Sequence, residues 1–255
     1  MENKKKKKTQ IDIILPNYNS YKFIEETIKS IKNQNFSHWK LTIVDDNSNQ
    51  KTKKILKKIL KNKKIQVYWL KKNRGAGFCR NYAIKKTKSP FIAFIDSDDI
   101  WKKNKLKNQI NFMTKNNYSF TYTYYETFGE RKKIISPPLK FNYSSFIHNT
   151  SIATSTMMIK RSDIKNIKFT KTKICEDYYF KCKLLKKVNY AFCLNKYLTK
   201  YRIRKNSLQI SALRNFFWIW KINKDYNKLN FLENFFSLFY ISINSIKKYN
   251  GKHLL

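Results

Sequence analysis

The chain has 255 residues, of which 42% are hydrophobic and 16% aromatic, enough apolar material for one large domain with a buried core. It has four glycines and four prolines, a content that argues against a fibrous or low-complexity chain. Its 55 lysines and arginines against 16 aspartates and glutamates give a net charge of +39. This charge fits a protein that binds nucleic acid, an anionic membrane surface or a diphosphate ligand, or a chain that is simply rich in lysine throughout. No RNA-binding signature, zinc-finger spacing or helix-turn-helix pattern accompanies the lysines, so we do not expect nucleic acid as a partner.

The start of the chain and its cysteines indicate the compartment. Residues 1–10 are a run of lysines with no apolar segment behind it, which predicts a disordered basic tail and not a signal peptide. No apolar stretch is long enough to span a bilayer. The four cysteines form no C-x-x-C pair and have no histidine partner nearby, which suits neither a disulfide framework nor a zinc site. We therefore expect a cytoplasmic protein.

Strands alternate with helices in the first part of the chain. The apolar runs predict strands at residues 11–15, 41–44, 65–70 and 91–95. Between them, helices are predicted at residues 21–33, from the Asp45-Asp46-Asn47-Ser48 turn to about residue 62, and after Gly75-x-Gly77. This order predicts an α/β fold with a mostly parallel, Rossmann-like mixed sheet and helices on its faces.

The fourth strand ends in three carboxylates within four residues, Asp96-Ser97-Asp98-Asp99. Ligand sites of α/β sheets form at the carboxyl ends of the strands. Clustered acids repel one another unless a cation or a proton lies among them, and alternating Asp96 and Asp98 could both bind one divalent ion. The alternative is that one of these residues caps a helix that starts near Ile100 and Trp101.

Gly75-x-Gly77 is a weak dinucleotide fingerprint, because it lacks a third glycine and follows the third strand. As a turn it would let Arg80 project from the start of a helix toward a phosphate. The alternative is an ordinary surface arginine on that helix.

The second part of the chain is less regular. We expect a helix that ends near residue 116, a half-exposed strand at 118–125, a polar loop at 126–150 and a strand at 152–159. Glu176 and Asp177 precede an apolar helix, where acids also commonly complement the helix dipole.

The first part of the chain contains four notable segments: Ile13-Ile14-Leu15-Pro16-x-Tyr18-Asn19, Val44-Asp45-Asp46-x-Ser48, Asn73-x-Gly75-x-x-x-x-Arg80-Asn81 and Phe94-Ile95-Asp96-Ser97-Asp98-Asp99. In this order and spacing they resemble the family 2 glycosyltransferases of GT-A fold. The resemblance is close over residues 1–110 and implies transfer of a sugar, with inversion, from a nucleoside-diphosphate sugar. UDP is the commonest nucleotide of this family, and dTDP or GDP donors also occur. The acceptor would be a hydroxyl of a glycan or lipid-linked molecule, in the synthesis of cell-surface polysaccharide.

The resemblance also implies the roles of individual residues. The nucleotide-sugar site would contain Pro16, Asn17, Tyr18, Asp45, Asp46, Arg80, Asp96, Ser97 and Arg204. Within this set, Pro16, Tyr18 and Asp46 would line the nucleoside pocket, and Asn17 stands where the family often has threonine or another small residue. Asp96 and Asp98 would form the D-x-D element that binds ribose and a divalent metal ion, Mn²⁺ or Mg²⁺. Asp177 would be the general base for the acceptor hydroxyl, with Glu176 the second candidate.

Two departures refine this expectation. Arg204 stands where similar enzymes often carry a histidine near the metal or the diphosphate, and a guanidinium there could hold the diphosphate. No Gln-x-x-Arg-Trp element appears, which argues against a processive polymer synthase.

The implied organisation is a GT-A domain at 11–210, with a nucleotide-binding half at 11–110 and an acceptor half at 111–210. A helical extension follows at 211–255, rich in aromatic residues with basic flanks. Its helices could lie on the inner face of the cell membrane, near a lipid-linked acceptor. They could equally pack on the domain or in a homodimer. Two other functions stay open at this point: a basic nucleic-acid-binding protein, and a catalytically inactive GT-A domain that binds nucleotide.

Overall fold

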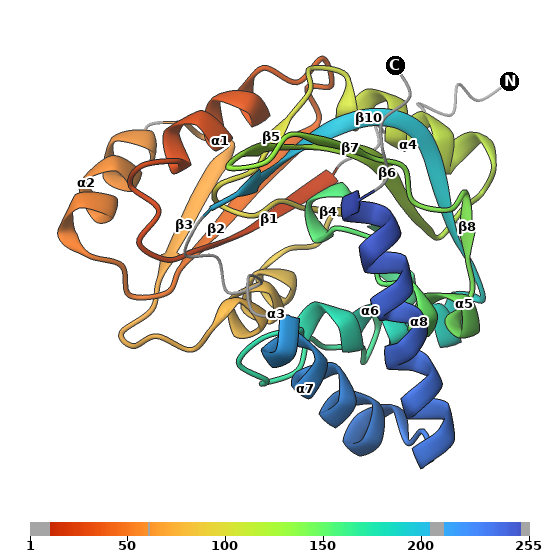
Figure 1. Cartoon of the computed structure of the whole chain (residues 1–255). Helices are drawn as coiled ribbons and strands as arrows, with labels where there is room; N and C mark the ends of the chain where they lie inside the picture. Colours follow the sequence, from red (N-terminus) through yellow and green to blue (C-terminus); the bar gives the residue numbers. More distant parts are fainter. Residues whose placement is uncertain (1–10, 61, 205–211, 251–255) are drawn as a thin grey trace, which may run out of the picture.

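The computed structural model describes residues 11–60, 62–204 and 212–250 (Figure 1). The predicted basic tail at 1–10 and the predicted boundary between residues 210 and 211 lie outside these residues. The strands are β1 Ile11–Asn17, β2 Trp39–Asp45, β3 Ile65–Trp69, β4 Phe91–Phe94, β5 Ile100–Trp101, β6 Phe120–Gly129, β7 Lys133–Ile135, β8 Lys140–Phe141, β9 Met158–Lys160 and β10 Ala191–Ile203. The α-helices are α1 Ile24–Lys32, α2 Gln50–Ile59, α3 Ala76–Lys86, α4 Lys105–Lys115, α5 Tyr143–His148, α6 Glu176–Val188, α7 Ala212–Ile222 and α8 Phe231–Asn250. Two 3₁₀ turns, η1 Thr154–Thr156 and η2 Arg161–Ile164, and a π-helical segment, η3 Asn223–Asn227, complete the described elements.

The strands form one mixed sheet in the order β3-β2-β1-β4-β9-β6-β10-β5, with β7 beside β6 and β8 beside β10. The first four strands in this order are parallel, as the alternation of strands and helices predicts. β9 then pairs antiparallel with both β4 and β6, and β6 and β10 run parallel to each other. Because β1, β2 and β4 are parallel neighbours, their carboxyl ends meet at one edge of the sheet, where Asn17 lies opposite Asp45.

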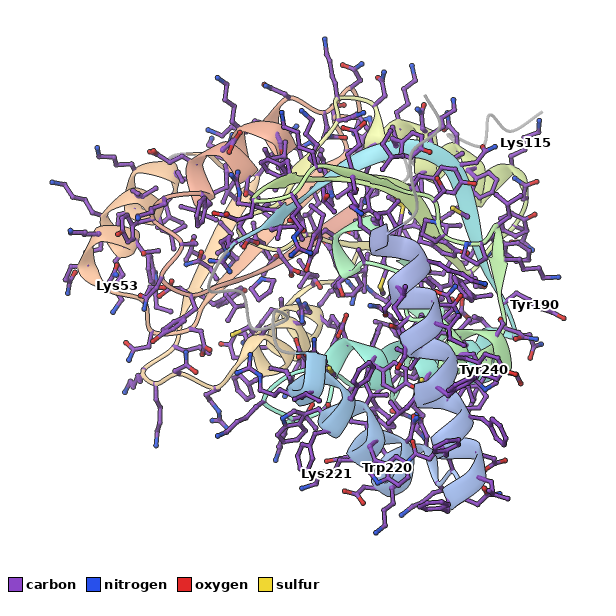
Figure 2. The ribbon with its side chains drawn as sticks, viewed as in Figure 1. Lys53, Lys115, Tyr190, Trp220, Lys221 and Tyr240 are labelled. Carbon is purple, nitrogen blue, oxygen red and sulfur yellow. The ribbon has the colours of Figure 1, made fainter. Side chains whose placement is uncertain are left out.

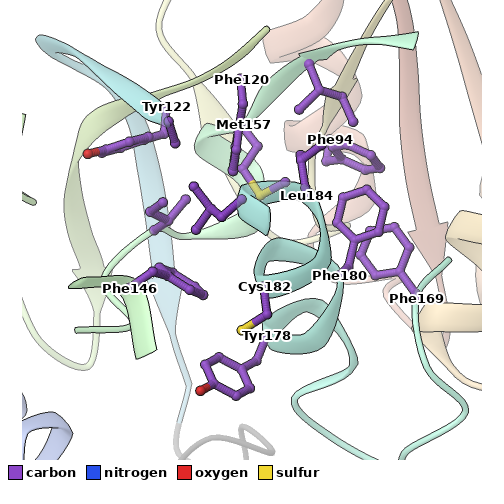
Figure 3. Packing of buried hydrophobic residues seen from close by; sticks show 14 of the residues in the cluster. Phe94, Phe120, Tyr122, Phe146, Met157, Phe169, Tyr178, Phe180, Cys182 and Leu184 are labelled. Carbon is purple, nitrogen blue, oxygen red and sulfur yellow. The ribbon is translucent and has the colours of Figure 1, made fainter. Parts of the chain in front are cut away.

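The sheet separates two hydrophobic cores. Alternate residues of β1 point to opposite faces, so Ile13 and Leu15 contribute to one core and Ile14 to the other. The first core is covered by α1, α2 and α4, whose buried residues include Ile28, Leu56 and Leu106. The second core contains residues of α3 and α6 and is rich in aromatic rings, many of which Figure 3 shows. Phe169 and Phe180 stack there with their ring centroids 4.0 Å apart, beside Phe94 at the end of β4.

The predicted helix start at Ile100 is wrong. Ile100 and Trp101 form the short strand β5, which pairs antiparallel with β10, and the helix begins only at Lys105. Trp101 is held in the core by a hydrogen bond from its indole Nε1 to the carbonyl of Ser155. The acids of residues 96–99 therefore do not cap a helix.

Two other segments differ from expectation. The predicted strand at 152–159 is a strand only from Met158, because Thr154–Thr156 form the turn η1 and its side chains bond to acids. The predicted loop at 126–150 contains the end of β6, the strands β7 and β8, and the helix α5. Asn142 and Ser145 start α5 with a reciprocal capping box, a local signal that the loop prediction missed.

The C-terminal helices are present, as predicted. α7 continues into η3, and α8 packs across α5 and α7 (Figure 1). Within the described residues, no helix is long and apolar enough to cross a membrane.

Candidate active site

Asn17 and Asp45 lock the ends of β1 and β2 together. Asn17 Nδ2 donates to Asp45 Oδ1 over 2.7 Å, and Asp45 Oδ2 accepts from the backbone N–H of Ser48 over 3.0 Å. The Ser20 hydroxyl donates to the remaining amide oxygen of Asn17. Both predicted site residues are buried, with exposed fractions of 1% and 0%, so their side chains shape the loops that follow the strands.

Asp46 holds the loop between β3 and α3. Its two carboxylate oxygens accept the backbone N–H groups of Arg74 and Gly75 over 2.7 and 2.8 Å. Gly75 has φ +85°, a conformation that a residue with a side chain rarely adopts, so this glycine is needed for the turn. Asp46 therefore positions the start of α3, the helix that carries Arg80.

Arg80 joins two acids that come from different parts of the chain. Its Nη2 lies 2.6 Å from Asp96 Oδ1 after β4, and its Nη1 lies 2.6 Å from Glu176 Oε1 at the start of α6. The side chain is 5% exposed and its guanidinium lies over the ring of Phe169. These contacts exclude the alternative of a surface arginine. The two carboxylates raise the pKa of Arg80 against the effect of burial, so the group stays charged.

α3 can approach α6 because residue 77 is glycine. A Cβ at Gly77 would lie 2.7 Å from the carbonyl oxygen of Thr170 and 2.8 Å from Cγ of Glu176. The second glycine of Gly75-x-Gly77 thus serves close packing against Glu176.

The three acids after β4 have different surroundings. The side chains of Asp96 and Asp98 are 29% and 15% exposed, whereas Asp99 is buried and accepts hydrogen bonds from Ser155 Oγ and from the backbone N–H of Arg202. Burial, with the negative charges of Asp98 and Asp96, raises the pKa of Asp99. Burial also raises the pKa of Asp98, although Arg204 opposes it. Ser97 is half-buried between Asp96 and Asp98.

Two arginines at the end of β10 approach these acids. Arg204 Nε lies 2.9 Å from Asp98 Oδ2, and the Arg204 side chain is 46% exposed. Arg202 donates from Nε to the carbonyl of Asp98 over 2.8 Å and forms an ion pair with Glu26. Arg204 thus lies beside Asp98 with part of its guanidinium accessible.

Asp177 is held by its own helix and by η1. Its Oδ2 accepts from Lys181 Nζ over 2.6 Å and from the hydroxyl of Thr154 over 2.7 Å. Burial alone would raise the pKa of Asp177, but the positive charges of Lys181 and Arg80 and these hydrogen bonds outweigh it and lower the pKa. Glu176 differs, because burial outweighs Arg80 and raises its pKa. The two acids are therefore not equivalent, because the pKa of Asp177 is lowered and that of Glu176 is raised.

The structure brings most of the predicted site residues together. Six of them are neighbouring charged groups: Arg80, Asp96, Asp98, Glu176, Asp177 and Arg204. Pro16 is buried at the end of β1, and Tyr18, next to it, is 53% exposed. Sequence reasoning missed Lys181, Thr154 and Ser155. The four-residue spacing of Asp177 and Lys181 on one helix was a signal for the first of these. Nothing local indicated the other two.

The residues of the D-x-D segment fit a divalent ion that is bound partly by the protein and partly by the substrate. Among the described residues, no group of three or more His, Cys, Asp or Glu side chains forms a metal site. Asp96 and Asp98 are partly exposed oxygen donors separated by one residue. Mg²⁺ and similar ions are commonly held by one or two carboxylates together with substrate phosphates, and this pair matches that pattern.

Comparisons with known proteins show the family of the chain. The sequence model of the family described as glycosyl transferase family 2 matches residues 12–187. The chain belongs to this family. It is a glycosyltransferase, and its fold is of GT-A type.

Two curated relatives and one solved structure are similar over most of the chain. The putative teichuronic acid biosynthesis glycosyltransferase TuaG of Bacillus subtilis is 34% identical over 206 residues, 79% of this chain and 82% of the relative. The UDP-Glc:alpha-D-GlcNAc-diphosphoundecaprenol beta-1,3-glucosyltransferase WfgD of Escherichia coli is 32% identical over 252 residues, 95% of this chain and 98% of the relative. The crystal structure of S. aureus TarS 1-349 in complex with UDP-GlcNAc superposes with a TM-score of 0.73 at 23% identity, over 94% of this chain and 73% of that one.

Proposed function

We propose that this glycosyltransferase moves a sugar, with inversion and with a divalent metal ion, from a nucleoside-diphosphate sugar to a hydroxyl of a lipid-linked or glycan acceptor. The nucleotide is UDP, and the product enters a cell-surface polysaccharide. The names of the relatives support this, since one is a putative teichuronic acid biosynthesis glycosyltransferase and another is named for the transfer of glucose from UDP-Glc to a diphosphoundecaprenol-linked GlcNAc. With such an acceptor, the enzyme acts at the cytoplasmic face of the membrane.

The observation that carries the proposal is the double contact of Arg80. One buried guanidinium binds Asp96 of the D-x-D segment and Glu176 beside Asp177. It therefore connects the acids of the donor side with the acids of the acceptor side. A transfer reaction requires these two sets of acids to lie beside one another.

On the donor side, Asp96 and Asp98 would hold the metal ion. When bound, such an ion neutralises the charge that grows on the diphosphate as the sugar leaves. Arg204 is 46% exposed beside Asp98, and its guanidinium is suited to a diphosphate oxygen. Pro16 in β1 and Tyr18 just after it would border the nucleoside, and Ser97 would lie next to the ribose. Asn17 and Asp45 hold the end of β1, and Asp46 holds the loop before α3.

On the acceptor side, Asp177 is the proposed base. Its carboxylate is ionised, and Lys181 and Thr154 both bond to Oδ2, which leaves Oδ1 for the acceptor hydroxyl. Glu176 is bound to Arg80 through Oε1 and is 13% exposed, so it orients the guanidinium. Attack by the activated hydroxyl on the face of the sugar opposite the diphosphate inverts the anomeric carbon.

The test is transfer from UDP-glucose and UDP-GlcNAc to a short-chain diphospholipid-linked GlcNAc with Mn²⁺ present. Asp98→Asn should lower kcat/KM by about a hundredfold or more, because charge stabilisation of the leaving group is lost. Asp225→Asn, an exposed acid in η3, is the matched control and should leave turnover unchanged. Arg204→Ala should raise the KM for the donor, whereas Lys200→Ala, which alters an exposed residue of β10 just before it, should not.

Three results would separate the parts of the proposal. Full turnover after chelation of divalent ions would contradict the metal, and a product with the anomeric configuration of the donor would contradict inversion. Nucleotide binding without transfer to any acceptor would indicate an inactive nucleotide-binding domain.

A further inference from the structure

α8 has its polar residues inside and its aromatic residues outside. The side that faces the domain carries Asn234, Ser237 and Asn244, each of which hydrogen-bonds to a backbone carbonyl of another element. Asn234 and Ser237 are 1% and 0% exposed, and Asn223 of η3 donates to both. A helix at a protein surface normally buries its apolar side. Here these hydrogen bonds attach the helix to the domain, together with the buried side chain of Ile241.

The outer side of α8 is a continuous aromatic surface. We call it the aromatic face, and its residues are Phe231, Leu232, Phe235, Phe236, Phe239 and Tyr240, which are 45–70% exposed. They form two adjacent rows with a spacing of four residues, so they project from one half of the helix surface. Phe235 packs against both Phe236 and Phe239, and Figure 2 shows Tyr240 on the same helix. Contiguous exposed apolar surface of this kind indicates a contact with an apolar partner.

Lysines lie close to the aromatic face. Residues 221–250 contain five lysines against one aspartate and one glutamate. Lys221 is exposed at the end of α7, Lys224 and Lys228 are exposed between α7 and α8, and Lys247 is exposed near the other end of α8. Figure 2 shows Lys221 and Trp220 at the end of α7, and the ring of Trp220 contacts Phe231 at the start of α8.

Charge distinguishes the two occupants that could cover this face. A second copy of the chain would bring two bodies of net charge +39 together and place the lysines of both copies near one junction. An anionic bilayer has the opposite sign, and each basic group near its surface adds to binding. A helix with an apolar face and basic flanks is suited to the boundary between headgroups and acyl chains.

We propose that the aromatic face of α8 docks the enzyme on an anionic membrane, with its rings at the boundary of headgroups and acyl chains and the flanking lysines on the lipid phosphates. The inference deepens the proposed function and rests on it in one respect, since docking serves catalysis only if the acceptor is lipid-linked. The docking surface itself is defined by α8 and its neighbours alone.

The experiment measures co-sedimentation of the full chain with vesicles of pure phosphatidylglycerol or pure phosphatidylcholine, without donor or acceptor. The wild type should bind phosphatidylglycerol vesicles and lose most of this binding in high salt. Phe235→Gln with Phe239→Gln should lower the partition coefficient about tenfold or more, because two rings no longer enter the bilayer. Lys221→Gln, Lys224→Gln and Lys228→Gln together should lower it by about a hundredfold, from about fivefold for each charge.

Matched controls separate binding through this surface from nonspecific hydrophobic or electrostatic binding elsewhere on the chain. Leu60→Gln with Leu139→Gln removes two exposed apolar side chains elsewhere, and Lys54→Gln with Lys57→Gln and Lys58→Gln removes three exposed lysines of α2. The apolar control should bind as the wild type does. The α2 control should lose far less binding than the variant that lacks Lys221, Lys224 and Lys228. Because all the altered side chains are exposed, circular dichroism melts should confirm that the variants are folded.

Several outcomes would overturn the proposal. They are no binding of the wild type to phosphatidylglycerol, equal binding of the Phe235/Phe239 variant, or a dimer in sedimentation velocity that this variant abolishes. Failure of docking is distinct from failure of the proposed function. Transfer to a water-soluble acceptor analogue without vesicle binding would contradict only the proposed docking. Vesicle binding without transfer from any donor would contradict only the proposed catalytic function.

Discussion

Arg80 donates from Nη1 to Glu176 Oε1 over 2.6 Å, although 96 positions of sequence separate the two residues. The same guanidinium donates from Nη2 to Asp96 over 2.6 Å. α3 and α6 are thereby joined at the edge of the sheet where the D-x-D segment lies. The relationship matters because each acid is partly removed from water, and removal of the shared cation would leave two negative charges without a partner.

Arg80→Met should therefore destabilise the fold as well as abolish turnover. We expect the free energy of unfolding at neutral pH to fall by about 3–5 kcal/mol, measured by urea denaturation, because a buried charge loses its partner. Arg131→Met, which alters an exposed arginine in the β6–β7 turn, is the control and should lie within about 0.5 kcal/mol of the wild type. An Arg80→Met variant as stable as the wild type would show that Asp96 and Glu176 are adequately solvated without the guanidinium.

Lys181 should set the acid limb of the pH profile. Of the groups that lower the pKa of Asp177, the charge of Lys181 has the largest effect. This pKa lies below the usual range of aspartate, so the ionised form should persist as the pH falls through 4. In Lys181→Met, burial is no longer opposed by this charge, and the pKa of Asp177 rises. The acid limb of kcat/KM should then move to higher pH by about one unit or more.

The control for Lys181 is Lys183→Met, an exposed lysine of the same helix. Its pH profile should follow that of the wild type. A purely structural role of Lys181 would lower activity equally at all pH values, and that result would contradict its assignment as a positioning residue for Asp177.

Gly77→Ala should impair catalysis through Glu176. The new methyl group would lie 2.7 Å from a backbone oxygen and 2.8 Å from Glu176 Cγ, so α3 and the first turn of α6 must move apart. We expect a loss of about 1–3 kcal/mol in unfolding free energy, as for other overpacked sites. Since Arg80 moves with α3, kcat should fall more than the stability loss explains when both are measured at a temperature where the variant is folded. An unchanged kcat would indicate that the contact of Arg80 with Glu176 tolerates this shift.

Lys105 should destabilise the wild-type protein, and Lys105→Met should remove that effect. The side chain is 0% exposed and its Nζ packs on the ring of Trp101, with no hydrogen-bond partner in the described part of the chain. Burial lowers its pKa, so the folded state loses this proton at a lower pH than the unfolded state, which binds it below about pH 10.4. Wild-type stability should thus rise as the pH increases from 7 toward 10.

In Lys105→Met this pH-dependent contribution is absent. The variant should be more stable than the wild type by about 1–3 kcal/mol at pH 7, and the difference should shrink as the pH approaches 10. Denaturant melts at both ends of this range measure it, with Lys103→Met, an exposed neighbour, as the control. A difference that is constant with pH would mean that Lys105 keeps its proton in the folded state.

The sequence by itself determined the parallel half of the sheet and the positions of its polar strand ends. Apolar periodicity and turn residues act over a few positions, so β1, β2 and the acids after β4 could be predicted from their own neighbourhoods. The same holds for Asp177, which lies in the first turn of its helix with Lys181 one turn later.

Only the tertiary structure decided which charged groups meet. Arg80 with Glu176 and Arg204 with Asp98 depend on how distant elements pack, and no local pattern encodes such pairs. The turn η1 was predicted as strand because its hydroxyls find their acid partners only in the folded chain. The orientation of α8 has the same cause. Its sequence is amphipathic whichever side faces the domain, and the hydrogen-bond partners of Asn234 and Ser237 turn the aromatic side outward.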